Sequence, residues 1–109
     1  MFSISVIVPV YNEEKTLLKI LEKYNPLKKN INIELIIVND GSNDNTKNLI
    51  ENNSSMFDKV IHLSKNKGKG NAVREGLKIA KNEYIFIQDA DLEYDPNDLT
   101  NFIKLAKTK

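Results

Sequence analysis

Three apolar runs in this sequence are each followed closely by acidic side chains. The runs span residues 4–10, 33–38 and 84–87. The acids that follow them are Glu13, Asp40, Asp89 and Asp91. Ligands of open α/β sheets bind outside the carboxyl ends of the strands. If the runs are parallel strands of one sheet, all of these acids lie on one rim, which needs a cation before it can accept a phosphate group.

Amphipathic segments alternate with the apolar runs along the chain. Apolar side chains recur at helical spacing in residues 14–24, in residues 68–80 and after Pro96, and a shorter helix is expected from Thr46. Residues 60–63 give a further, weaker strand. This βαβαβαβα order predicts an α/β fold, a Rossmann-like three-layer α/β/α domain with a parallel sheet and right-handed crossovers.

We expect the strand order 3-2-1-4, by analogy with nucleotide-binding folds. That order places a crevice between the first and fourth strands, across which Glu13 would face Asp89 and Asp91. The 109 residues are enough for one compact domain. No linker, repeat or low-complexity tract divides residues 1–109, so the whole chain is interpreted as a single domain.

Composition excludes several classes of protein. The chain has 16 Lys and Arg residues against 15 Asp and Glu residues, so it lacks the basic excess of a nucleic-acid-binding protein. It has no cysteine for a disulfide or a thiolate zinc site. No segment approaches the ~20 apolar residues of a membrane span, and the N-terminus lacks the pattern of a secretory signal. We therefore expect a cytoplasmic protein that binds no nucleic acid.

The Asp89-Ala90-Asp91 segment predicts a metal site. Two ionised carboxylates this close repel each other, and a divalent cation removes the repulsion while bridging to phosphate oxygens. The alternative is a solvated acidic loop that caps the next helix, but the position directly after a buried strand favours the metal. A calcium EF-hand loop is excluded, because Tyr94 stands where that loop needs glycine and Thr100 where it needs glutamate.

The second strand is expected to end in the turn formed by Asn39, Asp40, Gly41 and Ser42. The Asp40 carboxylate would accept hydrogen bonds from a nucleobase or ribose, Gly41 would allow a tight turn, and Ser42 or Asp44 would cap the next helix. The alternative for this segment is a simple strand–turn–helix corner without a binding role.

The first strand is expected to end near Pro9, where a missing backbone donor is tolerated better than at a strand centre. Tyr11 would pack beside a base, and Glu13 would accept a hydrogen bond from a ribose hydroxyl. The alternative for Glu13 is a purely local role, in which its charge favours the helix N-terminus through the helix dipole.

A glycine- and lysine-rich loop precedes the third helix. Gly68 and Gly70 permit close approach of a ligand to the backbone, while Lys69 and Arg74 would meet phosphate or sugar oxygens. Neither a Walker A loop nor a dinucleotide fingerprint fits, since Val73 stands where the latter needs its third glycine. A solvated lysine loop is the alternative.

His62 is the single histidine of the chain. It is expected in or near the third strand, away from the acidic rim, so a structural role is favoured over a catalytic one. No Ser/His/Asp or Cys/His set can be assembled from this sequence.

These motifs together resemble the family 2 glycosyltransferases of the GT-A fold, and among them the polyprenyl-phosphate sugar synthases such as dolichyl-phosphate mannose synthase. The resemblance covers nearly the whole chain, and its four blocks stand in the family's order. They are residues 6–14, 36–46, 68–74 and 89–93.

The resemblance implies a site for a UDP- or GDP-linked sugar. Its implied base and ribose contacts are Pro9, Tyr11, Glu13 and Asp40. Lys69 would lie near the diphosphate or the sugar, where it would act in catalysis together with Asp91. The implied ligands of Mg²⁺ or Mn²⁺ are Asp89, Asp91 and Glu93. The family often has aspartate where this chain has Asn39, a difference that leaves the base-contacting position, Asp40, in place.

The implied reaction is metal-assisted sugar transfer with inversion, to an acceptor such as a polyprenyl phosphate. A polyprenyl phosphate is already anionic and needs no general base. Such an acceptor implies peripheral association with the inner face of the membrane. Complete family members are longer and continue into an acceptor-binding half, which this chain is expected to lack.

Two other functions fit parts of the sequence. The chain would act as a nucleotide-sugar-binding module without turnover if it is a fragment of a split or truncated transferase. A nucleotidyltransferase shares the alternating sheet and the acidic metal site, but its glycine- and arginine-rich loop after the first strand is unlike Tyr11-Asn12-Glu13-Glu14.

Overall fold

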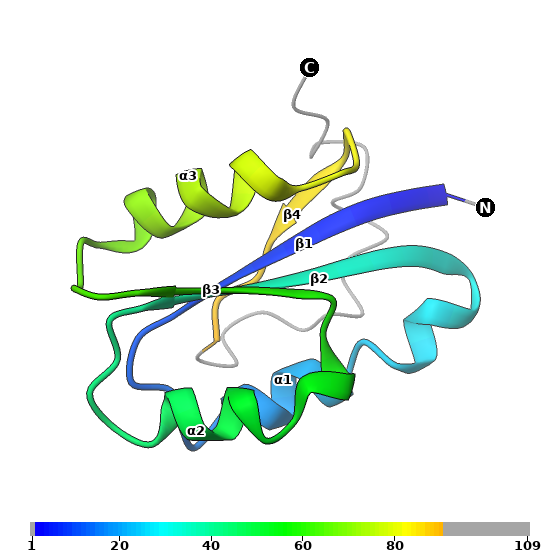
Figure 1. Cartoon of the computed structure of the whole chain (residues 1–109). Coiled ribbons are helices and arrows are strands. Elements are labelled where there is room, and N and C mark those ends of the chain that lie inside the picture. The colour runs from blue at the N-terminus through cyan, green and yellow to red at the C-terminus, as the bar shows by residue number, and fades with distance from the viewer. Residues whose placement is uncertain (1, 91–109) are drawn as a thin grey trace.

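The computed structural model describes residues 2–90 as a parallel sheet with helices on both faces. The strands are β1 (Phe2–Val10), β2 (Ile31–Asp40), β3 (Lys59–Leu63) and β4 (Ile85–Ile87). They pair in parallel in the order β3-β2-β1-β4 (Figure 1). The predicted fold class and strand order are therefore confirmed.

Three α-helices cover the sheet. They are α1 (Leu17–Glu22), α2 (Thr46–Glu51) and α3 (Lys69–Ile79), joined by the 3₁₀ turns η1 (Pro26–Lys29) and η2 (Ser54–Met56). Helices α1 and α2 lie on one face and α3 on the other, which gives the predicted three layers (Figure 1). The last helix that we predicted, after Pro96, lies outside the described residues.

Two apolar clusters, one on each face of the sheet, form the core. Alternate residues of β1 and β2 pack against α1 and α2, with Ile20 and Ile50 among the buried helical side chains. The remaining strand residues, such as Ile7 and Ile36, pack under α3. A Cβ atom on Gly76 would lie 2.7 Å from Ile7 Cγ2, so glycine allows α3 to approach β1 closely.

β1 continues beyond the residues that pair with β4. β1 pairs with β4 only from Ser5 to Ile7, so Pro9 lies beyond the last paired residue on that side and its missing N–H breaks no paired bond.

Helix α1 begins at Leu17, three residues later than the periodicity predicted, because the preceding residues form a turn whose amides donate to the Glu13 carbonyl.

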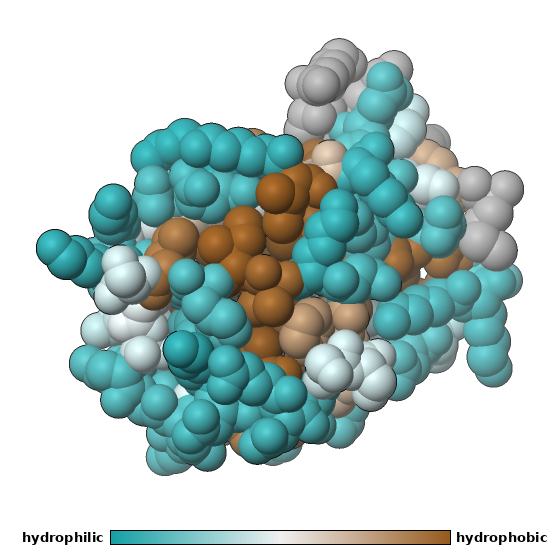
Figure 2. All heavy atoms as spheres, viewed as in Figure 1, coloured by the Kyte–Doolittle hydropathy of each residue, from teal (hydrophilic) through white to brown (hydrophobic). Residues whose placement is uncertain are grey.

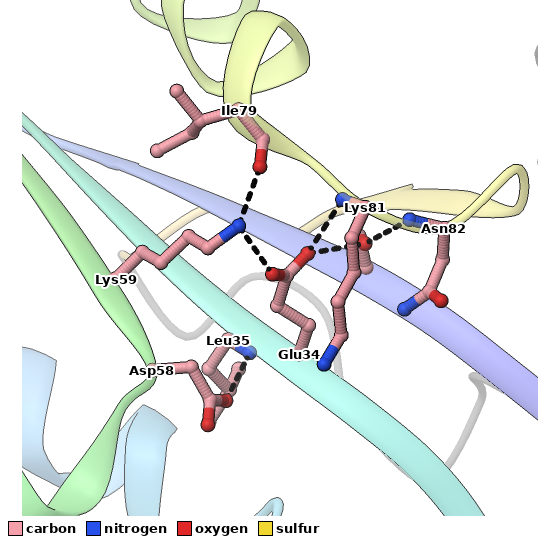
Figure 3. A network of polar contacts seen from close by, with 8 residues as sticks. Glu34, Leu35, Asp58, Lys59, Ile79, Lys81 and Asn82 are labelled. Carbon is pink, nitrogen blue, oxygen red and sulfur yellow. Dashed lines mark hydrogen bonds and ion pairs between the residues drawn. The ribbon is translucent and has the colours of Figure 1, made fainter.

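A buried polar network joins the elements at the amino-terminal edge of the sheet (Figure 3). Glu34 on β2 is 2% exposed and lies 2.8 Å from the Lys59 ammonium on β3. The Ser5 hydroxyl and the Lys81 amide donate to its other oxygen at 2.7 and 3.0 Å. Lys59 also donates to the last carbonyl of α3, that of Ile79, at 2.7 Å. The network therefore fixes the end of α3 that lies farthest from the acidic rim.

The edge strand β3 leaves an apolar surface on the molecule. In the view of Figure 1, apolar atoms gather across the middle of the face where β3 runs between α3 and α2 (Figure 2). Val60 on β3 is 36% exposed and Leu77 on α3 is 40% exposed. No helix within residues 2–90 combines the length and apolar character needed to cross a membrane.

Candidate functional site

A pocket of about 350 Å³ opens at the carboxyl edge of the sheet, a size within the range of small-molecule sites. It takes side chains from beyond the ends of β1, β2 and β4 and from the start of α3. It brings together six predicted site residues, namely Pro9, Tyr11, Glu13, Asp40, Lys69 and Asp89, whereas Arg74, which was also expected to meet phosphate or sugar oxygens, does not line it. Asp91 and Glu93 lie outside that part.

The loop after β1 is fastened to the loop after β2 by Asn12. The Asn12 amide donates to Ser42 Oγ at 2.9 Å, and Asn12 Oδ1 accepts from the amides of Asn43 and Asp44 at 2.9 and 3.3 Å. Asn12 has φ of 53°, in the left-handed region that asparagine tolerates better than most residues. This clasp fixes the two residues that flank it, Tyr11 and Glu13, at the pocket.

Asp40 holds the glycine- and lysine-rich loop. Its carboxylate is almost fully buried and accepts the amide of Lys67 on Oδ1 and the amide of Gly68 on Oδ2, both at 2.9 Å. Each carboxylate oxygen can accept a second hydrogen bond. Asp40 therefore orders the loop from inside the molecule and keeps some accepting capacity toward the pocket.

Gly41 allows this loop to lie against the end of β2. Its φ is +70°, and a Cβ atom there would come within 2.5 Å of Asn66 N and of the Lys65 carbonyl carbon. The strand end and the loop thus touch through backbone atoms, which leaves no room for a side chain. The predicted turn role of Gly41 is correct, and its close approach to the loop adds a second reason for glycine.

Lys69 and Asp89 form an ion pair at the wall of the pocket. The Lys69 side chain, on the first residue of α3, is 57% exposed, whereas that of Asp89, just beyond β4, is 19% exposed. The Asp89 carboxylate thus already binds one positively charged group, the Lys69 ammonium. The oxygen chemistry of Asp89 suits Mg²⁺ or Mn²⁺. Among residues 2–90 alone, no three acidic or histidine side chains gather as a metal cluster.

Glu13 is connected to the chain beyond β4 through Thr16. The Thr16 hydroxyl lies 3.1 Å from Glu13 Oε2 and in contact with the Ala90 carbonyl. The Glu13 amide donates to Thr46 Oγ1 at 3.1 Å. The predicted crevice between β1 and β4 is therefore bridged at its base by hydrogen bonds, with Glu13 on one side of it.

The pocket includes residues that were not named as its contacts from the sequence. They are Val10, Asn66, Ala72 and Ala90, together with Gly68, which was expected only to permit close approach of a ligand. Gly68 and Ala72 belong to the predicted loop and helix, where a small residue next to a glycine-rich turn is a usable signal of close ligand approach. Nothing in the sequence marks Asn66 or Ala90, because their places depend on the course of a loop and of a strand end.

His62 lies nearer to the rim than predicted. Its Nδ1 atom is 3.1 Å from Asn39 Nδ2, next to Asp40, because β3 pairs with β2 up to Leu63. It does not line the pocket. Burial lowers the pKa of His62, as does the Lys47 charge, and the Glu51 charge opposes them. The structural role expected of His62 agrees with a neutral ring beside α2.

The sequence pattern of one protein family, described as Glycosyl transferase family 2, matches residues 5–109. The chain belongs to this family. An undecaprenyl-phosphate 4-deoxy-4-formamido-L-arabinose transferase of Proteus mirabilis is 33% identical over 109 residues, which cover 95% of this chain and 33% of that protein. The family resemblance stated from the motifs is thus confirmed.

Two solved structures share the fold of this family 2 chain. Staphylococcus aureus TarS 1-349, in complex with UDP-GlcNAc, has a TM-score of 0.72 and 28% identity over 95% of this chain and 32% of its own. The mannosyltransferase PcManGT of Pyrobaculum calidifontis, in complex with GDP-Man and Mn²⁺, has a TM-score of 0.73 and 25% identity over 95% of this chain and 31% of its own. This chain spans about a third of the length of all three relatives.

Proposed function

We propose that this chain is the nucleotide-sugar-binding part of a glycosyltransferase that uses a UDP- or GDP-linked sugar and a polyprenyl phosphate acceptor. One observation carries the proposal. Six residues chosen from the ends of separate strands and from one loop line a single pocket at the carboxyl edge of the sheet. Chance would scatter six such residues over the surface, whereas a nucleotide site at this edge requires them together.

The nucleoside end of the donor would lie between Pro9, Tyr11 and Asp40. Tyr11 is 43% exposed at the pocket and offers an aromatic face for a base. Asp40 keeps carboxylate lone pairs for a base N–H while holding Lys67 and Gly68. Glu13, whose Oε2 accepts from the Thr16 hydroxyl, would also accept from a ribose hydroxyl.

The diphosphate would lie over Lys69 and Asp89. Asp89, Asp91 and Glu93 would hold Mg²⁺ or Mn²⁺, which supplies positive charge for the departing nucleoside diphosphate. Lys69 would turn from Asp89 toward the phosphate oxygens and add charge where the leaving group becomes negative. The complex of PcManGT with GDP-Man and Mn²⁺ supports a divalent ion beside the nucleotide in the proposed site.

We propose a polyprenyl phosphate as acceptor because of the chemistry of its phosphate group. A phosphate nucleophile is already ionised and would attack the anomeric carbon from the side opposite the nucleoside diphosphate, which inverts the configuration. The name of the Proteus mirabilis relative supports a lipid phosphate as acceptor. Such an acceptor would bring the protein to the cytoplasmic face of a membrane.

A second candidate is donor binding without turnover by these 109 residues. It is favoured by the share of the relatives that the chain spans, about a third. The two candidates share the pocket and differ only in whether sugar is released from the nucleotide.

Calorimetric titration of the chain with UDP- and GDP-sugars, with and without Mn²⁺, tests the proposal, paired with an assay of nucleotide release in the presence of polyprenyl phosphate. We expect metal-dependent binding of one nucleotide sugar. Asp91→Ala should abolish the metal dependence with little loss of fold. Equal affinity with and without metal in the parent chain would overturn the donor site, and binding without release would select the second candidate.

A further inference from the structure

The backbone of the segment that begins at Asp89 is held from behind by buried side chains. Gln88, the residue before Asp89, is fully buried, and so is Tyr24. The Tyr24 hydroxyl donates to Gln88 Oε1 at 2.7 Å, and Gln88 Nε2 donates to the carbonyl of Asp89 at 2.9 Å. A chain of two hydrogen bonds thus runs from the core to the first acidic residue of the proposed metal site.

The next peptide group is held from the same side. The Thr16 hydroxyl contacts the carbonyl of Ala90. Thr16 occupies the N-cap position of α1, where a threonine side chain ordinarily accepts a backbone N–H of the first turn. Here it makes no such capping bond. The hydroxyl instead contacts the Ala90 carbonyl and the Glu13 carboxylate.

Burial alone would favour an apolar residue at position 88. β4 alternates between the two apolar clusters, and Phe86, on the same face as Gln88, packs among the apolar side chains near α1. A buried amide is tolerated only when its polar atoms find partners, and a tyrosine hydroxyl in the core has the same requirement. The Tyr24 hydroxyl holds the Gln88 amide, and the Gln88 amide holds the Asp89 carbonyl.

We infer that Tyr24, Gln88 and Thr16 are positioning residues, which fix the peptide carbonyls of Asp89 and Ala90 and so preset the acidic segment for a divalent cation. This inference rests on the proposed function. Bonds to the backbone fix the Asp89 peptide without consuming any oxygen of its carboxylate, which pairs with Lys69. Partners behind metal ligands typically change metal affinity by 10- to 100-fold.

The double variant Gln88→Met/Tyr24→Phe separates positioning from packing. It replaces both polar side chains by apolar groups of similar shape, which removes their mutual hydrogen bond at little cost to folding, and it takes the Nε2 donor away from the Asp89 carbonyl. Nucleotide affinity is measured by calorimetry with UDP and GDP, each with and without Mn²⁺, on the full 109-residue chain. Thermal unfolding is followed in parallel. Ser5→Ala serves as a control, because it removes a buried hydrogen bond at the opposite edge of the sheet.

In the double variant we expect nucleotide affinity in Mn²⁺ to fall by about tenfold, with metal-free affinity and melting temperature close to the parent. Ser5→Ala should lower the melting temperature and leave both affinities unchanged. A double variant that binds nucleotide in Mn²⁺ within about twofold of the parent would overturn the inference while leaving the proposed function intact. Absence of metal-dependent binding in the parent would instead refute the proposed function.

Tyr24→Phe gives an independent test if the double variant does not fold. It removes one hydroxyl from a residue that does not line the pocket and should lower affinity in Mn²⁺ without lowering metal-free affinity. Equal losses with and without Mn²⁺ would indicate a general packing defect and would count against positioning.

Discussion

Lys69 and Asp89 pair at the wall of the pocket, although they come from the start of α3 and from beyond the end of β4. The lysine supplies the positive charge that the carboxylate lacks when no metal is present. In the proposed site a metal ion and the lysine would compete for one carboxylate, and the lysine would become available for phosphate oxygens once a cation took its place. This exchange predicts opposite effects of one substitution on two affinities.

Lys69→Met should bind Mn²⁺ more tightly than the parent when nucleotide is absent, because Asp89 has lost its internal counter-ion. The same variant should bind the nucleotide diphosphate more weakly when Mn²⁺ is present, by about tenfold, because one charge-assisted hydrogen bond to phosphate is missing. Titration of Mn²⁺ alone, followed by titration of nucleotide at saturating Mn²⁺, measures both.

Lys67→Met is the matched control for Lys69. It removes the same charge from the same loop, but its side chain does not line the pocket. Both affinities should stay close to those of the parent. If Lys67→Met reproduced the changes seen in Lys69→Met, the effect would come from the general charge of the loop and not from the pair with Asp89.

Asp40→Asn should loosen the loop that carries Lys69. The two loop amides donate to different oxygens of Asp40, so the NH₂ group of an asparagine would face one of the two N–H donors. We expect a loss of about 1–3 kcal/mol in the free energy of unfolding and weaker nucleotide binding with or without Mn²⁺. Urea denaturation and calorimetry measure the two effects.

A comparison variant for Asp40 is Asp44→Asn, in the loop after β2. Asp44 accepts the Thr46 amide but does not line the pocket. It should lower stability without weakening nucleotide binding to the folded chain. Retention of full nucleotide affinity in Asp40→Asn would contradict a base contact at Asp40.

Much of this site follows from sequence, because its residues occupy positions that a parallel sheet brings together. The order β3-β2-β1-β4 and the gathering of Glu13, Asp40 and Asp89 required only the apolar runs, the acids after them and the geometry of parallel strands. Asn66 and Ala90 could not be placed in this way. The course of their segments depends on hydrogen bonds between loops that lie far apart in the sequence.

The use of each polar side chain was less predictable than its location. The Asp40 carboxylate was interpreted as facing a ligand, and two buried loop amides occupy part of it. Helix α1 was predicted from residue 14, and contacts of Glu13 and Thr16 delay it to Leu17. Glu34 interrupts an apolar strand and attracted no interpretation, because its partner Lys59 is 25 positions away.

Glu34 should make stability depend on pH. Burial alone would raise its pKa, but hydrogen bonds from Lys59, the Lys81 amide and Ser5 outweigh burial and lower it. The folded-state pKa is thus below the unfolded value of about 4.3. The stabilisation is complete above the unfolded pKa and is lost as pH falls through the folded pKa. Glu34→Gln should remove this part of the acid sensitivity.

Denaturation in urea between pH 3 and pH 7 measures the effect. This range spans the ordinary pKa values of carboxylates, about 4. At neutral pH, Glu34→Gln should cost about 1–3 kcal/mol, since it weakens a hydrogen-bonded, charged group in a buried site. Glu75→Gln, which removes an exposed pair with Lys78, should cost less than about 1 kcal/mol. Equal losses in the two variants would show that burial of Glu34 adds nothing.

Asn12 offers a test of the clasp that fixes Tyr11 and Glu13. Asn12→Gly keeps the left-handed backbone available and removes the side chain, with it the Oδ1 that accepts the Asn43 and Asp44 amides. We expect nucleotide affinity to fall by about tenfold, because the base and ribose contacts lose their fixed positions, one lost hydrogen bond being worth about 1 kcal/mol. Asn12→Asp retains an accepting oxygen and should restore most of that affinity. Since both substitutions tolerate positive φ, failure of aspartate to restore binding would show that the amide group of Asn12, and not its accepting oxygen, supports the pocket.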